Sequence, residues 1–204
     1  MLFRGTGHWQ PIYRKGLSGR ATASGPALTG RRDRRPQGRW LALGPLPPRR
    51  ALRLKGNSWL ANTIGNPLAT TIALQHLIFE GTLDRFPGLK IIAAHGGGYL
   101  PSYAPRSDHA CFVAPQNCNP DIKLKKKPTE YLNQLHFDSL VFTPEGLRHL
   151  VAQVSASQIM LGSDHPIPWE EHPVDHVFAT ATLSDEEKAA ILGDNAARLL
   201  GIQA

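Results

Sequence analysis

Two apolar runs that end on polar residues indicate buried strands. Residues 90–94 lead into His95 and three glycines, and residues 158–161 lead into Gly-Ser and then Asp164. A continuous apolar run is typical of a strand covered on both faces, as in a parallel sheet. A weaker alternating run over residues 135–139 predicts a third strand between these two.

Helical spacing of apolar residues separates these strands. Thr143-Pro144-Glu145 favours a helix start, because Thr is a good N-cap and Pro fits the first helical position. Alternation of helices with strands predicts a parallel α/β sheet with right-handed crossovers. The spacing predicts helices from Pro67 to about residue 78, over 143–154, from Ser184 to Leu192 with a stop at Gly193, and over 195–200, and it predicts a loop over 57–66.

Residues 1–55 differ from the remainder in composition. They contain no Val, one Ile, eight Gly and six Pro, with no lasting helical or strand period. Such a segment buries too little apolar surface to offset its ordering entropy, so we expect a basic, low-order region outside the fold of 56–204. Three interpretations of this segment are open: an arm that binds nucleic acid or membranes, an organellar targeting peptide, and an out-of-frame reading of a GC-rich gene. We favour the third.

The positive charge of the chain is confined to its first quarter. The net charge is +7 overall, but residues 1–55 carry 13 of the 23 Lys and Arg residues and one of the 16 acids. Residues 56–204 therefore have a net charge of −5. We expect no nucleic-acid partner, because a basic segment with few interleaved aromatics is a weak signal for such binding.

Cysteine content and hydropathy bear on the compartment. Cys111 and Cys118 are the two cysteines, and their spacing matches no familiar metal pair. We interpret them as reduced thiols and expect a cytoplasmic protein. No apolar run approaches the roughly 18 residues that a membrane span requires, and the N-terminus lacks the apolar region of a secretory signal, so we expect no membrane partner.

The three predicted strands share a chemical feature at their ends. An apolar or alternating run comes before each of three polar positions, namely His95, Asp138 and the pair Asp164-His165. If the strands belong to one barrel, their carboxyl ends face one site. His and Asp there suit a divalent metal, zinc above all, and an imidazole beside a carboxylate also suits proton transfer.

Four segments carry a resemblance to a known family. They read GTLDRFPGLKIIAAHGGGYLP at 81–101, RSDH at 106–109, GSDHP at 162–166 and ILGDNAARLL at 191–200. Together they resemble the amidohydrolase superfamily. The most similar branch is the amidohydrolase-related group that includes aminocarboxymuconate-semialdehyde decarboxylase and γ-resorcylate decarboxylase. The resemblance covers residues 55–204.

The resemblance implies a fold and a set of roles. The family fold is a (β/α)8 TIM barrel, so 56–204 would form its C-terminal three to four βα units. Asp164 matches the metal-binding Asp of the eighth strand and would also act in catalysis. His95 matches the catalytic His that ends the sixth strand, and Arg106 matches a position that contacts a substrate carboxylate in some members. Asp138 has no family role, so we interpret it as a structural acid.

The remaining ligands of the family's metal have no match in this sequence. The family uses a His-x-His on the first strand and a His on the fifth, and the chain has neither. We interpret His76 as a half-buried helical residue rather than a ligand, and the spaced pair His172 and His176 as a coincidence. A catalytic zinc needs about three protein ligands. We therefore expect Zn²⁺ or another divalent metal to be held weakly or not at all.

The expected function is that of a metal-dependent hydrolase or carboxy-lyase (decarboxylase) acting on a small carboxylated substrate. The resemblance allows a homodimer of the family's kind. The alternative is an inactive, truncated or frameshifted remnant with a basic tail. Part of a barrel leaves sheet edges and apolar surface uncovered, so we also expect marginal stability and a tendency to aggregate.

Overall fold

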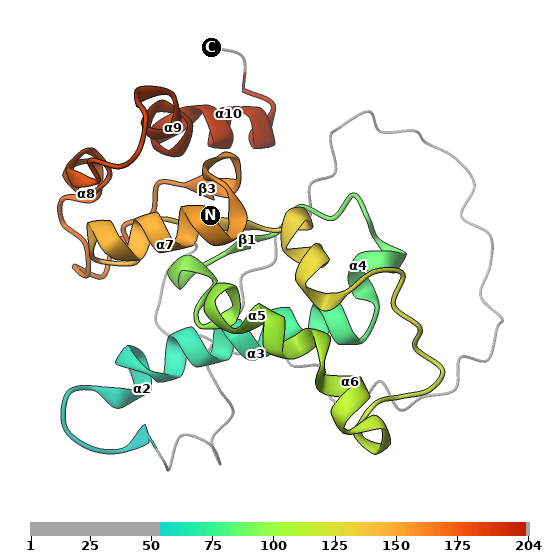
Figure 1. Ribbon diagram of the computed structural model, residues 1–204. Helices are drawn as coiled ribbons and strands as arrows, with labels where there is room; N and C mark the ends of the chain where they lie inside the picture. The colour runs from blue at the N-terminus through green and yellow to red at the C-terminus, as the bar shows by residue number, and fades with distance from the viewer. Residues whose placement is uncertain (1–53, 203–204) are drawn as a thin grey trace, which may run out of the picture. The chain divides into compact units, whose positions relative to one another are not determined.

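Three short parallel strands lie between helices in the computed structural model, which describes residues 54–202 (Figure 1). They are β1 (Ile92–Ala93), β2 (His136–Asp138) and β3 (Ile159–Met160), in the order β1-β2-β3. Ile92 pairs with His136, and Phe137 pairs with Ile159. All three lie where the apolar runs predict them, so the parallel α/β arrangement is confirmed.

Helices connect and cover these strands. In Figure 1, α3 and α5 lie on one side of the strands, and α9 and α10 lie on the other. The helices are α2 (Leu60–Thr63), α3 (Gly65–Phe79), α4 (Thr82–Arg85), α5 (Leu100–Asp108), α6 (Ala110–Val113), α7 (Pro144–Val154), α8 (Pro173–Ala179), α9 (Asp185–Ala189) and α10 (Asn195–Leu200). Shorter helical segments are η2 (His95–Gly97), η3 (Pro115–Asn117), η4 (Pro128–Gln134), η5 (Ala156–Gln158) and the π-helical η6 (Ala190–Asp194).

Local capping signals decide where two of these helices begin. The Thr143 side chain accepts a hydrogen bond from the Gly146 N–H at 3.0 Å, so the predicted start of α7 is confirmed. At α9 the Ser184 side chain accepts from the Glu187 N–H, while the Glu187 carboxylate accepts from the Ser184 N–H. This reciprocal capping box satisfies two N–H groups that the helix itself leaves without partners.

Two predicted boundaries are wrong. The segment predicted as a loop contains α2, and α3 begins at Gly65 rather than Pro67, which still lies in its first turn. The helix predicted to stop at Gly193 continues through η6 into α10. Gly193 does not end the helix because its backbone is not in the left-handed region, whereas Gly201 has φ of 70° and caps α10.

The core is built from both sides of the sheet. Phe137 in the central strand is fully buried, as are Leu74 of α3 and Ile91 before β1. Ile159 of β3 and Ile191 of η6 belong to the same core at 0% and 1% exposure. Side chains far apart in sequence thus fix the strands relative to their covering helices.

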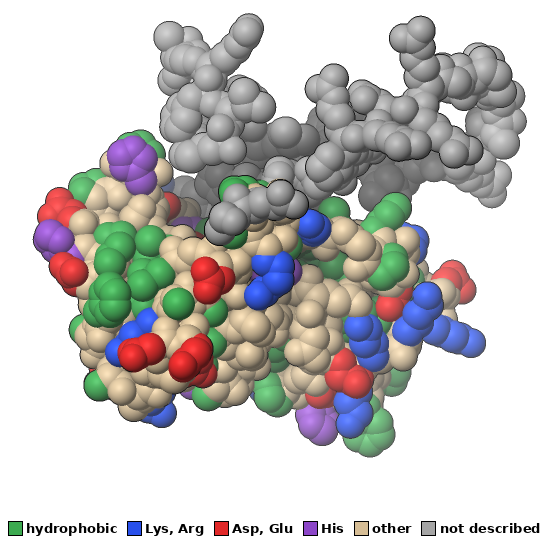
Figure 2. All heavy atoms as spheres, turned by 90° about the horizontal axis from the view of Figure 1, so that it is seen from above, with side chains coloured by type: hydrophobic (Ala, Val, Ile, Leu, Met, Phe, Trp, Pro, Cys, Tyr) green, Lys and Arg blue, Asp and Glu red, His purple; other side chains and the backbone are tan. Residues whose placement is uncertain are grey.

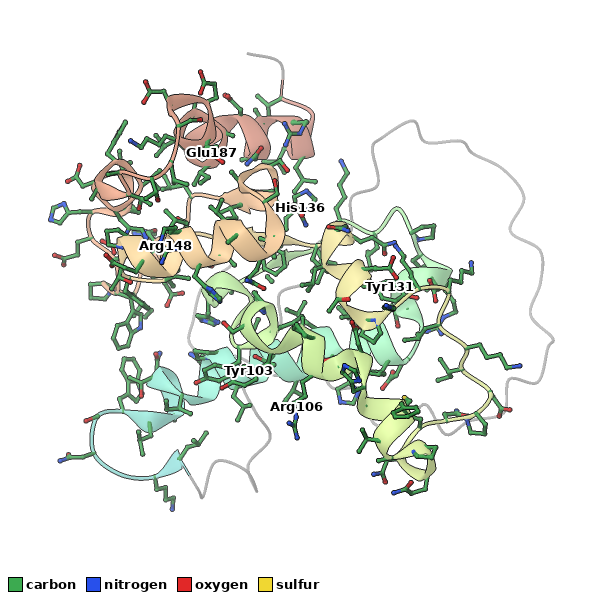
Figure 3. The ribbon with its side chains drawn as sticks, viewed as in Figure 1. Tyr103, Arg106, Tyr131, His136, Arg148 and Glu187 are labelled. Carbon is green, nitrogen blue, oxygen red and sulfur yellow. A yellow bond between two sulfur atoms is a disulfide. The ribbon has the colours of Figure 1, made fainter. Side chains whose placement is uncertain are left out.

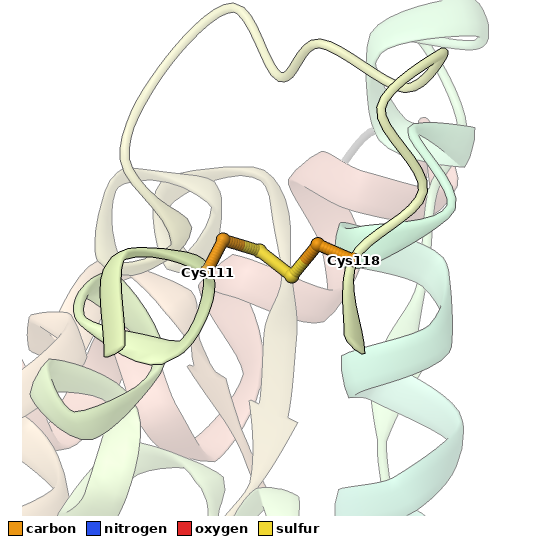
Figure 4. The surroundings of a disulfide bond; sticks show 2 residues. All are labelled: Cys111 and Cys118. Atoms are coloured by element: carbon orange, nitrogen blue, oxygen red, sulfur yellow. A yellow bond between two sulfur atoms is a disulfide. The ribbon is translucent and has the colours of Figure 1, made fainter. Parts of the chain in front are cut away.

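The cysteines are bonded to each other, which corrects the expectation of reduced thiols (Figure 4). Cys111 lies in α6 and Cys118 directly follows η3, and their Cα atoms are 5.8 Å apart. The turn of η3 folds the chain back within bridging distance, which residue spacing alone did not indicate. The expectation of a cytoplasmic protein, which reduced thiols supported, stays a prediction.

The described residues carry a mixed surface. Figure 2 shows acidic, basic and hydrophobic side chains interspersed over one face. None of the helices within 54–202 is long and apolar enough to cross a membrane. The low-order segment predicted for residues 1–55 falls almost entirely outside the described range, so its boundary stays a prediction.

Candidate functional site at the strand ends

The turn after β1 holds His95 in an uncommon backbone conformation. His95 has φ of 58°, in the left-handed region, and Gly96 and Gly97 follow with φ of 57° and 80°. A side chain on Gly97 would place its Cβ 2.7 Å from the Phe137 ring. The turn therefore needs glycine both for its conformation and for its approach to the core.

Asp138 at the end of β2 anchors this turn. Its carboxylate accepts hydrogen bonds from the N–H groups of His95 at 3.0 Å, Gly96 at 2.7 Å and Leu140 at 3.2 Å. Burial raises the pKa of this carboxyl, and the three N–H donors act in the opposite direction. The prediction that Asp138 is a structural acid fits this geometry, because it satisfies backbone donors that would otherwise lack acceptors.

The His95 ring is oriented from a different element. Its Nδ1 lies 3.0 Å from the Oγ1 of Thr70, a residue of α3 that is 2% exposed. The half-buried His95 is thus held by its backbone through β2 and by its ring through α3. With Nδ1 engaged, Nε2 is the nitrogen available for proton exchange with a ligand.

Asp164 lies in the loop that follows β3, also in the left-handed region, with φ of 61°. Its backbone carbonyl accepts from the Ile167 N–H at 2.9 Å. Its carboxylate has no hydrogen-bond partner among residues 54–202, and the residue is half-buried. Two residues earlier, a side chain on Gly162 would meet the Asp138 Cβ at 2.6 Å, so the ends of β2 and β3 are in close contact.

The sheet order sets how these groups can cooperate. His95 and Asp164 follow the two outer strands, and Asp138 follows the strand between them. Neighbouring strands are about 4.8 Å apart, so the outer strands β1 and β3, which lead to His95 and Asp164, are separated by roughly 10 Å. The Asp138 carboxylate therefore lies at the end of the strand between the two turns that carry the other side chains.

Three aromatic residues near these loops were not singled out from the sequence. Trp59 stacks on Trp169 with ring centroids 5.8 Å apart, and Phe142 meets Trp169 edge-on at 6.3 Å. Phe142 and Trp169 come from the loops after β2 and β3, which carry Asp138 and Asp164. Nothing local could indicate the stack, because Trp59 lies far from the other two in sequence.

Arg106 lies elsewhere. It is exposed in the last turn of α5 and lines an open pocket with residues of α3 and α6. None of the three strand-end residues lines that pocket. The structure thus places His95 in hydrogen-bond contact with Asp138 and places Arg106 in different surroundings. The contact of Arg106 with a substrate carboxylate stays a prediction.

A metal site is incomplete in the described part of the chain. No group of three or more His, Cys, Asp or Glu side chains that could hold an ion occurs within residues 54–202. Asp164 supplies one suitable oxygen donor, but a catalytic site needs about three protein ligands. His172 and His176 do not form a pair, since His172 is exposed at the start of α8 and His176 is buried. The described donors therefore do not fit a catalytic metal by themselves.

The comparison with protein families identifies the same family that the four sequence motifs resemble. The profile of the family described as Amidohydrolase matches residues 28–202. A 2-amino-3-carboxymuconate-6-semialdehyde decarboxylase of Dictyostelium discoideum is 34% identical over 148 residues, which cover 71% of this chain and 40% of that protein. A γ-resorcylate decarboxylase of Polaromonas is 28% identical over 147 residues, covering 71% and 44%. The chain spans less than half the length of these curated relatives.

Solved structures share the fold. The 5-carboxyvanillate decarboxylase LigW of Sphingomonas paucimobilis has a TM-score of 0.70 at 24% identity, covering 80% of this chain and 49% of that one. A dihydroxybenzoic acid decarboxylase of Polaromonas, solved with bound manganese and an inhibitor, has a TM-score of 0.69 at 25% identity, covering 81% and 50%. The expected partial barrel is thereby confirmed. That relative binds manganese, and a divalent metal in this chain, zinc included, stays a prediction.

Proposed function

Because this chain belongs to the amidohydrolase family, we propose that its strand-end site serves metal-dependent decarboxylation of a small, planar carboxylated substrate. The observation that carries the proposal is the two-sided hold on His95 by Asp138 and Thr70. Its support is homology to decarboxylases of carboxylated aromatic and muconate compounds. Hydrolysis at a carbonyl centre is less favoured, because the curated relatives are decarboxylases.

His95 is the proton donor in this proposal. Decarboxylation breaks the bond between a substrate carbon and its carboxylate, and CO₂ leaves without the bonding electron pair. That pair must be taken up by a proton at the same carbon, which a positioned imidazolium can supply through Nε2. The proton lost from His95 then returns from solvent. Thr70 keeps the ring from rotating during this exchange.

Asp164 is one metal ligand in this proposal, and the described residues do not complete the set. A bound divalent ion would supply charge stabilisation for the carboxylated substrate. The Asp164 carboxylate is suited to this role because it is half-buried and unpaired within 54–202. We derive no catalytic step through the ion, since its other ligands are not found in this part of the chain.

The test measures CO₂ release from 2,6-dihydroxybenzoate by the full chain with added Mn²⁺. We expect the wild-type chain to release CO₂ faster than the metal-only background. The rate of release should fall at least about a hundredfold in His95→Asn and should not change in the control Asp185→Asn. Asp185 is an exposed acid in the first turn of α9 and far along the chain from the strand ends. Equal rates in the wild type and His95→Asn would rule out the assignment.

A second candidate, an inactive family member, is favoured by the incomplete donor set. On that account the wild-type chain releases no CO₂ above background and retains less than one metal ion per chain after dialysis. The same assay therefore separates the two candidates. Stoichiometric metal together with activity would exclude the inactive account.

A further inference from the structure

The disulfide lies on an exposed wall away from the strand-end site. Cys111 is exposed and Cys118 is half-buried, and both line the open pocket beside α6. This pocket is a cavity of about 1020 Å³ between α3, the junction of α5 with α6, and residues 117–124, which is enough room for a small organic molecule. Exposed disulfides are the ones that thiols reduce most readily. A small-molecule thiol therefore has access to this bond.

Hydrogen bonds tie the segment after α6 only to its own neighbours. Every hydrogen bond that residues 114–124 make within 54–202 joins groups at most four positions apart, as between the Asn117 N–H and the Ala114 carbonyl at 3.0 Å. The first long-range hydrogen bond comes at Lys125, whose N–H donates to the Asp84 carboxylate at 3.1 Å. Bonds of this local kind open together with the segment, so they do not anchor it to the remainder of the chain.

Apolar contacts hold the far end of this segment. Leu124 packs against the hydrophobic core, and the Ile122 side chain lies 3.5 Å from the place that a Cβ would take on Gly81. Residues 115–117 and 119–121 are exposed. Between α6 and Ile122, the disulfide is therefore the main tie that keeps the chain in place (Figure 4), and its loss should loosen the segment.

We propose that the Cys111–Cys118 pair is a reversible thiol–disulfide exchange site for a small-molecule thiol, and that its redox state controls the mobility of residues 114–124. The proposal goes beyond the decarboxylation proposed above and does not depend on His95 or on a metal. Cys111 is the sulfur that the thiol attacks, because it is the more exposed of the two and access decides which sulfur reacts.

The exchange takes two steps. In the first, the incoming thiolate bonds to the Cys111 sulfur, the bond between the two protein sulfurs breaks, and the Cys118 sulfur leaves with the electron pair and takes a proton from solvent. In the second, another thiolate attacks the small-molecule sulfur of the mixed disulfide and releases the Cys111 thiolate. Overall, the protein disulfide is reduced to two thiols, and two small-molecule thiols are oxidised to one disulfide. The reverse sequence restores the bond.

The first experiment locates the attack. The full, oxidised chain is mixed with millimolar reduced glutathione, quenched with acid at intervals, alkylated and analysed by peptide mass spectrometry. Glutathione should appear on Cys111 before both free thiols accumulate, and glutathione disulfide should restore the bond. With glutathione disulfide, Cys118→Ser should take up glutathione at Cys111 faster than Cys111→Ser takes it up at Cys118. A chain that stays oxidised in reduced glutathione, or that carries the adduct on Cys118, overturns the exchange site as proposed.

The second experiment measures the mobility of the segment by trypsin cleavage after the exposed Lys123. A protease binds several residues of opened chain, so the cleavage rate reports local opening. Cleavage after Lys123 should be about tenfold faster in the reduced chain than in the oxidised chain, because reduction removes the tie to α6. Replacing both cysteines by serine should give the fast rate with or without glutathione.

An internal control separates local opening from general unfolding. Arg148 is an exposed residue of α7, which lies away from α6 (Figure 3), and cleavage after it should keep its rate on reduction. Equal rates after Lys123 in the oxidised and reduced chains would show that the disulfide does not control the segment. An equal acceleration after Lys123 and Arg148 would contradict the proposal as well, because the whole chain would then be opening.

Discussion

The strand-end site and the open pocket that Arg106 lines with residues of α3 and α6 are held together in different ways. At the strand ends, one carboxylate accepts three backbone N–H groups, and glycine backbone packs against the fully buried Phe137. Around the pocket, residues 114–124 are mostly exposed and are tied to α6 by a disulfide. The first site is shaped by the fold itself, whereas one wall of the second is also tied by a covalent bond. Substitutions should therefore cost more stability at the first site than at the second.

The largest effect should come from Asp138→Ala. It leaves the N–H groups of His95, Gly96 and Leu140 without their acceptor in a poorly solvated place. We expect the free energy of unfolding to fall by about 3 kcal/mol or more, measured by urea denaturation. Asp138→Asn keeps one oxygen that can accept a hydrogen bond, so it should lower the free energy of unfolding by less. A loss below about 1 kcal/mol in Asp138→Ala would show that this anchor does not hold the turn.

Gly97→Ala should lower the free energy of unfolding nearly as much as Asp138→Ala. The added methyl group would lie 2.7 Å from the Phe137 ring, at a backbone φ of 80°. Strain and overpacking together should lower the unfolding free energy by about 2 to 3 kcal/mol. Gly193→Ala is the matched control, because nothing lies within 4 Å of its added methyl and its backbone is helical. That control should be neutral or slightly stabilising, and similar losses in both variants would contradict the account.

Removal of the disulfide should have a moderate effect confined to the cavity. The bond closes a short loop with a sequence separation of 7 residues. Replacing both cysteines by serine should lower the unfolding free energy by roughly 2 kcal/mol in the loop-entropy description. Metal-supported CO₂ release should not change. If the release falls, the two regions are not independent as described.

The pH dependence of stability offers a smaller test of the first region. Burial raises the pKa of Asp138, so the folded chain keeps this proton to a higher pH than the unfolded chain, where the value is near 3.8. The stabilisation from the protonated group is complete below about 3.8 and is lost as pH rises through the raised pKa. The unfolding free energy of the wild type should therefore fall with rising pH in that window, relative to Asp138→Asn. Parallel curves for the two proteins would contradict this.

Local signals in the sequence predict much of the fold and part of the site. The strand ends at His95 and Asp138 follow from apolar or alternating runs, and the start of α7 follows from Thr143 and Pro144. These features depend on neighbours in sequence, so a single chain is enough to infer them. The roles of His95, Asp164 and Arg106 came from the family resemblance rather than from such patterns.

Contacts between distant residues could not be predicted in the same way. The Trp59–Trp169 stack and the bond between the His95 ring and Thr70 each join elements that only the folded chain brings together. The disulfide was missed although its cysteines are close in sequence, because the reversal at η3 gives little signal. A pattern identifies the residue types near a site, but the fold decides which of them meet.

Native-state hydrogen exchange with and without a reducing agent tests the contrast between the two regions most directly. We predict slow exchange for the N–H groups of Gly96 and Leu140, which donate to Asp138, and no change on reduction. The N–H groups of residues 110–124 should exchange faster once the disulfide is reduced. Exchange that quickens equally in both regions would contradict the conclusion that the fold alone holds the site around His95.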